Sequence, residues 1–194
     1  TLFRSDRLGE KAVLSPVGVY CVNDGTAYVA LVLGHETETS MANLIEEVIR
    51  QKREDMPELE HVLILADGGG TNRADGILWC YELLRITKIL NIPMTMTHYS
   101  GGTSRHNVIE HALWSPISKH WKNKPFLSIE HVMRYVSETT TTDGQPITCW
   151  FDSRKYVSLR KQRKEARKAG TLENGKPVKL VSRSWLNELE NGRI

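Results

Sequence analysis

The chain of 194 residues contains no apolar run approaching the ~20 residues that a membrane-spanning helix needs, and no signal-peptide pattern opens it. Its three cysteines, Cys21, Cys80 and Cys149, lie far apart and lack CxxC spacing. These absences argue against a membrane partner, a disulfide scaffold and a cysteine-rich zinc site, and they are typical of a reducing compartment.

Several catalytic motifs are also missing. The Gly68-Gly69-Gly70 run is not followed by GK[ST] and does not fit GxGxxG, which disfavours a nucleotide cradle. Three histidines, His98, His106 and His111, lie close together in sequence but lack HExxH-type spacing, which disfavours a histidine zinc site. No internal repeat is present.

The net charge of +3 is modest but unevenly spread. Eight basic residues lie between Arg154 and Lys168 against one acid, Glu165. Such a density favours phosphate binding, although a solvated basic helix would have the same composition. The length and ordinary composition predict one domain with an appendage, which we place at residues 1–152 and 153–194.

The most informative stretch is Val62-Leu63-Ile64-Leu65-Ala66-Asp67-Gly68-Gly69-Gly70-Thr71-Asn72. The apolar run predicts a strand buried on both faces, and Asp67 then lies at the sheet edge where ligands of α/β proteins bind. The glycines let a ligand approach the backbone closely, and Asn72 can cap the next helix. A purely structural role for Asp67, as a capping residue, remains open.

The remaining patterns predict alternating strands and helices. Residues 1–10 look irregular, and an Asn-Asp-Gly turn joins strands at 12–22 and 27–33. Helices are expected over 37–53, 73–90 and 107–121, the last with a kink or an early stop at Pro116, and from Ser128 onward. A strand is expected at 94–99, a strand or anchor at 147–151, and a short strand and helix at 178–181 and 185–190.

This order predicts an α/β fold with a mixed sheet and flanking helices. A ribonuclease-H-like fold would have one more antiparallel strand in front, so the chain would begin after that first strand. Strand order alone does not separate this fold from other α/β folds.

Glu110 is a second candidate site residue, because it lies about one turn into a helix that follows a strand and a glycine loop. A βαβ arrangement would return Glu110 to the sheet edge of Asp67. Two converging carboxylates can hold Mg²⁺ or Mn²⁺, which activate phosphodiester chemistry. A solvated first-turn acid is the alternative interpretation of Glu110.

Two motifs together resemble one family. Ala66-Asp67-Gly68-Gly69-Gly70-Thr71-Asn72-Arg73 with Leu78-Trp79, and Gly102-Thr103-Ser104 with Asn107-Val108-Ile109-Glu110-His111, resemble the Rhodopirellula-type DDE transposases of bacterial insertion sequences. The resemblance continues through Glu138-Thr139-Thr140-Thr141 and Asp143-Gly144, and it spans roughly residues 17–152.

The resemblance implies an acidic triad on a ribonuclease-H-like fold. It implies Asp67 as the second Asp and Glu110 as the Glu, both metal ligands for Mg²⁺ or Mn²⁺, with Asn72 and His111 orienting ligands or substrate. The first Asp matches nothing here, because Asp6, Asp24 and Glu36 lie in other regions of the pattern.

The resemblance further implies DNA as the partner, both transposon ends and target, in a bacterial cytoplasm at the nucleoid. It leaves room for a homo-oligomer of the full-length protein. The basic residues that we expect to contact DNA are Arg105, Arg154, Lys155, Arg160, Lys161, Arg163, Lys164, Arg167 and Lys168.

The chain departs from the family in places. Ser100-Gly101 replaces two prolines, and His106, Ala112 and Pro116 replace a Trp, an Arg and a His. We interpret the chain as an incomplete transposase catalytic domain that is inactive alone. The alternatives are a non-catalytic DNA-binding transposase remnant and an unrelated α/β enzyme for phosphorylated small molecules.

Overall fold

The computed structural model describes residues 3–5, 12–73, 76–99 and 106–156. These residues include a 3₁₀ turn at Gly70–Asn72, labelled η2, and a π-helical turn at Glu110–Trp114, labelled η4. The elements in chain order are β1 (Phe3–Ser5), β2 (Ala12–Tyr20), β3 (Ala27–Leu33), α1 (Glu38–Asp55), β4 (Val62–Ala66), η2 (Gly70–Asn72), α2 (Ile77–Leu90), β5 (Met94–His98), η4 (Glu110–Trp114), α3 (Ser115–Trp121), α4 (Ile129–Ser137) and β6 (Ile147–Asp152).

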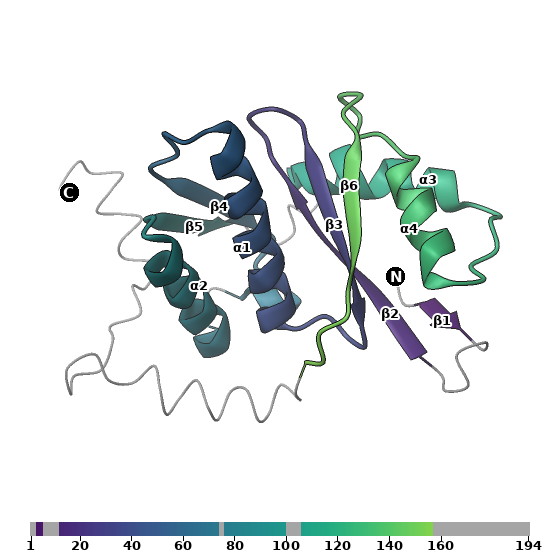
Figure 1. Ribbon diagram of the computed structural model, residues 1–194, viewed down its shortest axis with the longest axis horizontal. Helices are drawn as coiled ribbons and strands as arrows, with labels where there is room; N and C mark the ends of the chain where they lie inside the picture. Colours follow the sequence, from purple (N-terminus) through teal and green to yellow (C-terminus); the bar gives the residue numbers. More distant parts are fainter. Residues whose placement is uncertain (1–2, 6–11, 74–75, 100–105, 157–194) are drawn as a thin grey trace.

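The strands form two sheets (Figure 1). The larger sheet has the order β1-β2-β3-β6, in which β3 and β6 are parallel and the other pairs antiparallel. The smaller sheet consists of β4 and β5 in parallel. The α/β class and the mixed pairing are therefore as predicted. The expectation of one sheet is wrong, because no strand within the described ranges joins the two sheets.

The turn between β2 and β3 confirms the predicted hairpin. Gly25 has φ +72°, a left-handed conformation that glycine adopts without strain. The Thr26 amide and hydroxyl both donate to Asp24 Oδ1, at 3.0 and 2.6 Å, which holds the turn.

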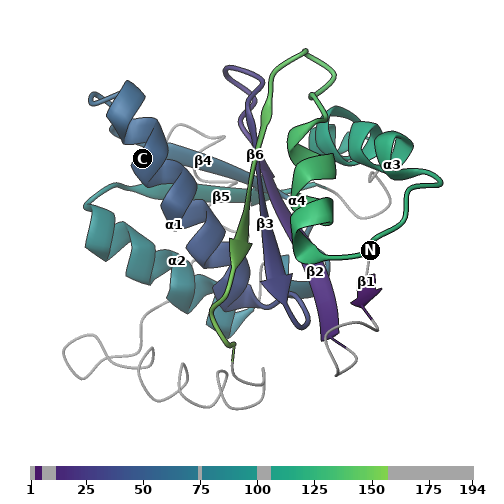
Figure 2. The same ribbon diagram turned by 45° about the vertical axis from the view of Figure 1, so that its right-hand side comes forward.

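Residues 3–5 correct the expectation of an irregular start. They form β1 and pair with residues 12–14 of β2. The sequence does not indicate this strand because three residues carry no detectable alternation. Figure 2 shows β1 beside one end of β2, and α4 alongside β6.

The prediction that β4 is buried on both faces is wrong. Leu63 and Leu65 are 59% and 47% exposed, whereas Val62 and Ile64 pack into the core beneath. The reason is that α1 and α2 both lie on one side of the small sheet, so alternate residues of β4 face outward.

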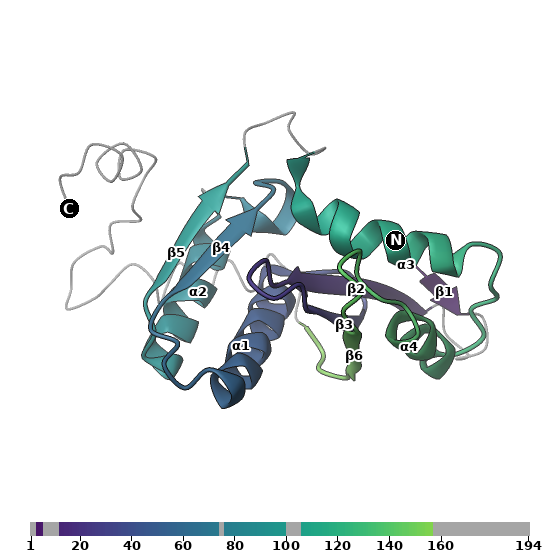
Figure 3. The same cartoon turned by 90° about the horizontal axis from the view of Figure 1, so that it is seen from above.

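Helix α1 packs between the two sheets (Figure 3). Its Ala42, Ile45 and Ile49 pack with α2 and the small sheet, and its Leu44 and Val48 pack against β2 and β3. The helix therefore buries two adjacent faces, and it sets how the sheets approach each other.

Helix α2 begins later than predicted. Its N-cap is Gly76, and Asn72 lies in η2 rather than capping the helix. The spacing of Trp79, Leu83, Ile86 and Leu90 at i, i+4, i+7 and i+11 predicts that they form the inner face of the helix, and all four are buried.

Glu82 lies off the spacing of these apolar residues, which predicts that it points away from the core, and this prediction is wrong. Its carboxylate is buried, with the residue only 6% exposed. It accepts hydrogen bonds from Thr39 Oγ1 at 2.8 Å and from Arg85 Nε at 2.7 Å, and these partners compensate its loss of water.

Pro116 alters the helix that follows β5. Lacking an N–H, it cannot bond the carbonyl of Ala112, and that carbonyl instead accepts from the Thr142 amide at 3.1 Å. One residue earlier, the Ser115 amide donates to the carbonyl of Glu110, which is the bond of a π-turn. The predicted irregularity at Pro116 is thus a π-helical turn that leads into α3.

Helix η4 is fixed to β2 through a glycine. A Cβ added at Gly18 would lie 2.6 Å from Trp114 Cζ2 and 2.9 Å from Leu113 Cδ2. Only a residue without a side chain lets the helix approach β2 this closely.

No helix in the described ranges combines the length and apolar character that crossing a bilayer requires. The strand and helix expected at 178–181 and 185–190 lie outside the described residues.

The close approach at Gly18 gives a testable prediction. Gly18→Ala should destabilise the fold by about 1–3 kcal/mol, because the added methyl overlaps the Trp114 ring. Urea unfolding measures the destabilisation. In combination with Trp114→Leu, the penalty of Gly18→Ala should shrink, since the ring that it overlaps is gone. An unchanged unfolding midpoint for Gly18→Ala would show that η4 does not pack on β2 as described.

Candidate active site at the strand ends

The candidate site lies where β3, β4 and β5 end. Asp67 follows β4 directly, and the Tyr99 amide beyond β5 donates to the Ala66 carbonyl at 2.9 Å. The parallel pairing of β4 and β5 thus continues up to Asp67. This is the edge of an α/β sheet at which ligands usually bind.

The Asp67 side chain is exposed and held by the turn that follows it. Its Oδ1 accepts the Gly69 amide at 3.0 Å. Gly68 has φ +74°, which an L side chain adopts only with strain. A Cβ at Gly69 would lie 3.7 Å from Asp67 Oδ2, so glycine keeps that side of the carboxylate uncovered.

His98 fixes the far end of the same turn. Its Nε2 lies 2.7 Å from the carbonyl oxygen of Asn72, which can only accept, so Nε2 carries the proton. The ring lies against Gly68, where an added Cβ would be 3.4 Å from His98 Cδ2. The sequence disfavours His98 as a zinc ligand, and the structure gives this side chain a part in shaping the turn.

Glu36 also reaches the turn. It lies in the loop between β3 and α1, and its Oε1 accepts the Thr71 hydroxyl at 2.5 Å. The loop after β3 therefore meets the loop after β4. The sequence patterns give Glu36 no role in the site; the signal that could have found it is its position three residues after a buried strand.

Glu110 and His111 form the first two residues of η4 and are both exposed. The Glu110 amide donates to the carbonyl of Asn107 at 3.1 Å, and Asn107 is itself buried. The backbone at Glu110 is thus held from both sides, by Asn107 and by the π-turn. The convergence of Glu110 with Asp67 stays a prediction.

The basic candidates fall into two groups. Arg105, Arg160, Lys161, Arg163, Lys164, Arg167 and Lys168 lie outside the described residues. Lys155 is exposed, and Arg154 donates to both carboxylate oxygens of Asp152 at 2.7 Å. Burial favours the neutral form of Asp152, but the bonds from Arg154 and Tyr156 outweigh it and lower the pKa of this carboxyl.

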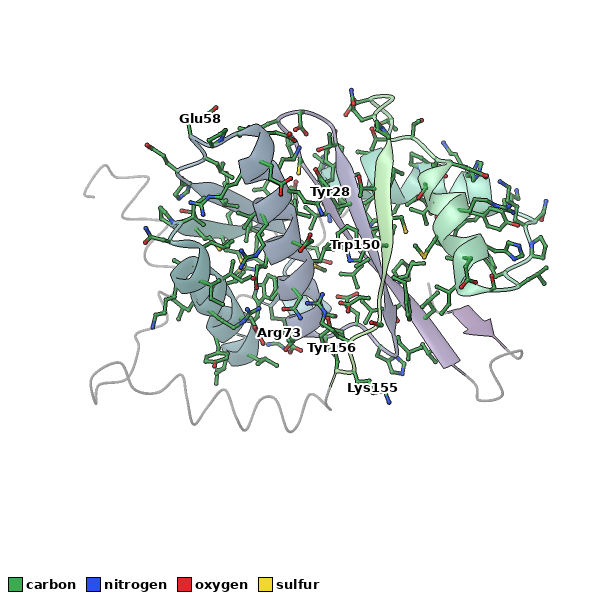
Figure 4. All side chains as sticks on the ribbon, in the orientation of Figure 1. Tyr28, Glu58, Arg73, Trp150, Lys155 and Tyr156 are labelled. Carbon is green, nitrogen blue, oxygen red and sulfur yellow. The ribbon has the colours of Figure 1, made fainter. Side chains whose placement is uncertain are left out.

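Tyr156 connects the end of β6 to the helices (Figure 4). Its hydroxyl donates to Asp152 Oδ2 at 2.5 Å and accepts from Asn43 Nδ2 at 3.2 Å. Asn43 in turn accepts from Arg85 at 3.0 Å. The first residues of the basic extension are therefore anchored to α1 and α2.

Thiol chemistry has no support in Cys21 and Cys149, which are both half-buried. Burial raises the pKa of Cys149 to about 12, and it also raises that of Cys21. Neither thiol forms an appreciable thiolate at neutral pH.

The candidate ligands are of the type that a hard divalent cation prefers, but they are too few to hold it alone. Asp67 offers carboxylate oxygen, the ligand type that Mg²⁺ and Mn²⁺ prefer. Within the described ranges, no group of three or more His, Cys, Asp or Glu is placed to hold a metal ion. Asp67 and Glu110 would therefore be a partial ligand set that needs completion.

A comparison with protein families identifies the chain. No curated protein and no solved structure matches it. A family model described as the Rhodopirellula transposase DDE domain matches residues 4–177. This match includes the strand ends, the glycine turn and η4, and it confirms the family predicted from the two motifs. The chain belongs to the Rhodopirellula transposase DDE domain family.

Proposed function

We propose that the chain is most of a transposase catalytic domain, which hydrolyses a phosphodiester at a transposon end and joins the freed 3′-hydroxyl to target DNA. The observation that carries this proposal is the meeting of three strand ends around the glycine turn after Asp67. DNA is the partner that the family implies.

The strand pairing supports a ribonuclease-H-like arrangement. In the described residues, β2 pairs beyond Leu14 only with β3, and β4 pairs only with β5. One strand added between β2 and β4, antiparallel to the first and parallel to the second, would join both sheets into one. We infer that the first catalytic Asp belongs at the end of such a strand.

Asp67 and Glu110 would hold the metal ions, and their carboxylates are the metal ligands that this chain supplies. Bound Mg²⁺ or Mn²⁺ would activate the attacking oxygen and neutralise charge on the leaving oxygen of the phosphodiester. Asn72 and His111 orient ligands or substrate beside them. Gly68 and Gly69 leave space for the DNA backbone to approach Asp67.

The basic residues after β6 supply the DNA contact. Lys155 is exposed, and the segment to Lys168 continues with the same charge. Because such contacts are made to phosphates, they position DNA without selecting its sequence. We place the protein at the bacterial nucleoid, and a homo-oligomer of a longer form stays a prediction.

A non-catalytic DNA-binding remnant is the second candidate. It is favoured by the lack of a three-residue metal group in the described part of the chain. The two proposals differ in whether the carboxylates of Asp67 and Glu110 are needed for cleavage of DNA.

Plasmid nicking separates these proposals. The isolated chain of 194 residues should leave supercoiled plasmid intact with Mg²⁺ or Mn²⁺, because two carboxylates cannot align attacking and leaving oxygens as a complete site does. A form that also supplies an Asp-ending strand between β2 and β4 should nick. Asp67→Ala or Glu110→Ala in that form should abolish nicking.

Two results would contradict this account. Nicking by the isolated chain that Asp67→Ala removes would show that the first acid lies within it. Nicking by the completed form that survives both substitutions would remove Asp67 and Glu110 from catalysis. Exposed Glu58, replaced by Ala, is the matched control that should change neither result.

The basic segment gives a separate prediction. Replacing Arg160, Lys161, Arg163 and Lys164 with Gln should weaken binding to duplexes of any sequence. The slope of log K against log salt should flatten by about 0.9 for each DNA phosphate that the variant no longer neutralises. The control changes four basic residues around α3 and α4, namely Lys119, Lys122, Lys124 and Arg134. An unchanged affinity and slope in the first variant would refute the assignment.

A further inference from the structure

We propose that Glu36 is a positioning residue of the candidate active site, which holds the turn of residues 69–72 in the shape that presents Asp67. This inference rests on the proposed function. Its structural basis is the hydrogen bond between Glu36 Oε1 and the Thr71 hydroxyl at 2.5 Å, which joins loops that lie 35 residues apart.

Hydrogen bonds of the neighbouring residues hold the backbone next to Glu36 in place. The next residue, Thr37, caps α1: its Oγ1 accepts the Ser40 amide at 3.0 Å, and its own amide donates to Ser40 Oγ at 2.9 Å. Thr39 is tied to α2 through its 2.8 Å bond to Glu82. Thr37, Ser40 and Glu82 are all buried, so the loop that carries Glu36 is fixed by the core.

The turn that Glu36 contacts needs such a fixed point. Three glycines precede Thr71, and glycine loses more conformational entropy on ordering than other residues. The backbone is pinned at Asn72 by His98, and Glu36 pins the neighbouring side chain of Thr71. The Thr71 hydroxyl also lies 3.4 Å from Asn72 Oδ1, but the carboxylate is the closer and stronger acceptor.

The effect reaches Asp67 through the backbone. The Asn72 amide donates to the Gly69 carbonyl at 3.0 Å, and the Gly69 amide donates to Asp67 Oδ1 at 3.0 Å. Glu36 thus acts through Thr71, Asn72 and Gly69. It supports the orientation of the Asp67 carboxylate without contacting the reacting atoms.

The experiment removes each end of the hydrogen bond in the full chain. Thr71→Val deletes the hydroxyl at nearly constant volume, and Glu36→Ala deletes the carboxylate. Each should weaken Mn²⁺ binding, measured by electron paramagnetic resonance, about 10-fold. Each should also speed hydrogen exchange of the Gly69 amide. The double variant should be no worse than either single variant, because both remove the same interaction.

Two conservative variants distinguish positioning from a loss of folding. Thr71→Ser keeps the hydroxyl and should restore Mn²⁺ affinity and slow exchange at Gly69. Glu36→Gln keeps an acceptor without the charge and should give an intermediate effect at an unchanged melting temperature. Glu58→Ala removes the same charge beyond the other end of α1 and should alter neither measurement.

The measurements distinguish a failure of the positioning role of Glu36 from a failure of the proposed function. Wild-type exchange at Gly69 in both Thr71→Val and Glu36→Ala would overturn the positioning role, as would additive effects in the double variant. A chain in which Mn²⁺ binding is absent, or is unaffected by Asp67→Ala, would overturn the proposed function instead. The exchange measurement still tests Glu36 in that case, because it needs no metal.

Discussion

The packing of α1 against both sheets is the constraint on which the arrangement depends. One face of the helix buries Ala42, Ile45 and Ile49 against the small sheet, and the adjacent face buries Leu44 and Val48 against β2 and β3. A fully buried Leu, Ile or Val contributes roughly 1.5–3 kcal/mol, whereas an exposed ion pair contributes about 0–1 kcal/mol. Apolar packing on the two faces of α1, rather than exposed ion pairs, therefore sets how the sheets meet.

This packing has a consequence for the site. The N-terminus of α1 lies where β3 ends, and the packing brings its leading loop to the loop after β4. On the other side of β2, Gly18 lets η4 approach, and the carbonyl that Pro116 leaves unbonded is satisfied by Thr142. Glu110 begins the π-turn of η4, and π-turns recur at functional sites.

Local signals in the sequence predict much of the fold. Three local predictions are confirmed, because each depends on neighbouring residues: the Asn-Asp-Gly turn, the helix α1 and the start of α4 at Ser128. Local signals do not predict three other features, because each depends on partners distant in sequence. These features are the exposed side of β4, the burial of Glu82 and the pairing of residues 3–5. The two motifs predict the family, but not the hydrogen bond between Glu36 and Thr71, which joins separate loops.

The central claim is that Asp67 and Glu110 share one metal site. The most direct measurement is anomalous diffraction from crystals of the chain soaked in Mn²⁺. The account predicts a peak about 2–2.5 Å from a carboxylate oxygen of each residue. Carboxyl groups more than about 10 Å apart, with no peak between them, would contradict it, because ions about 4 Å apart cannot be reached from such positions.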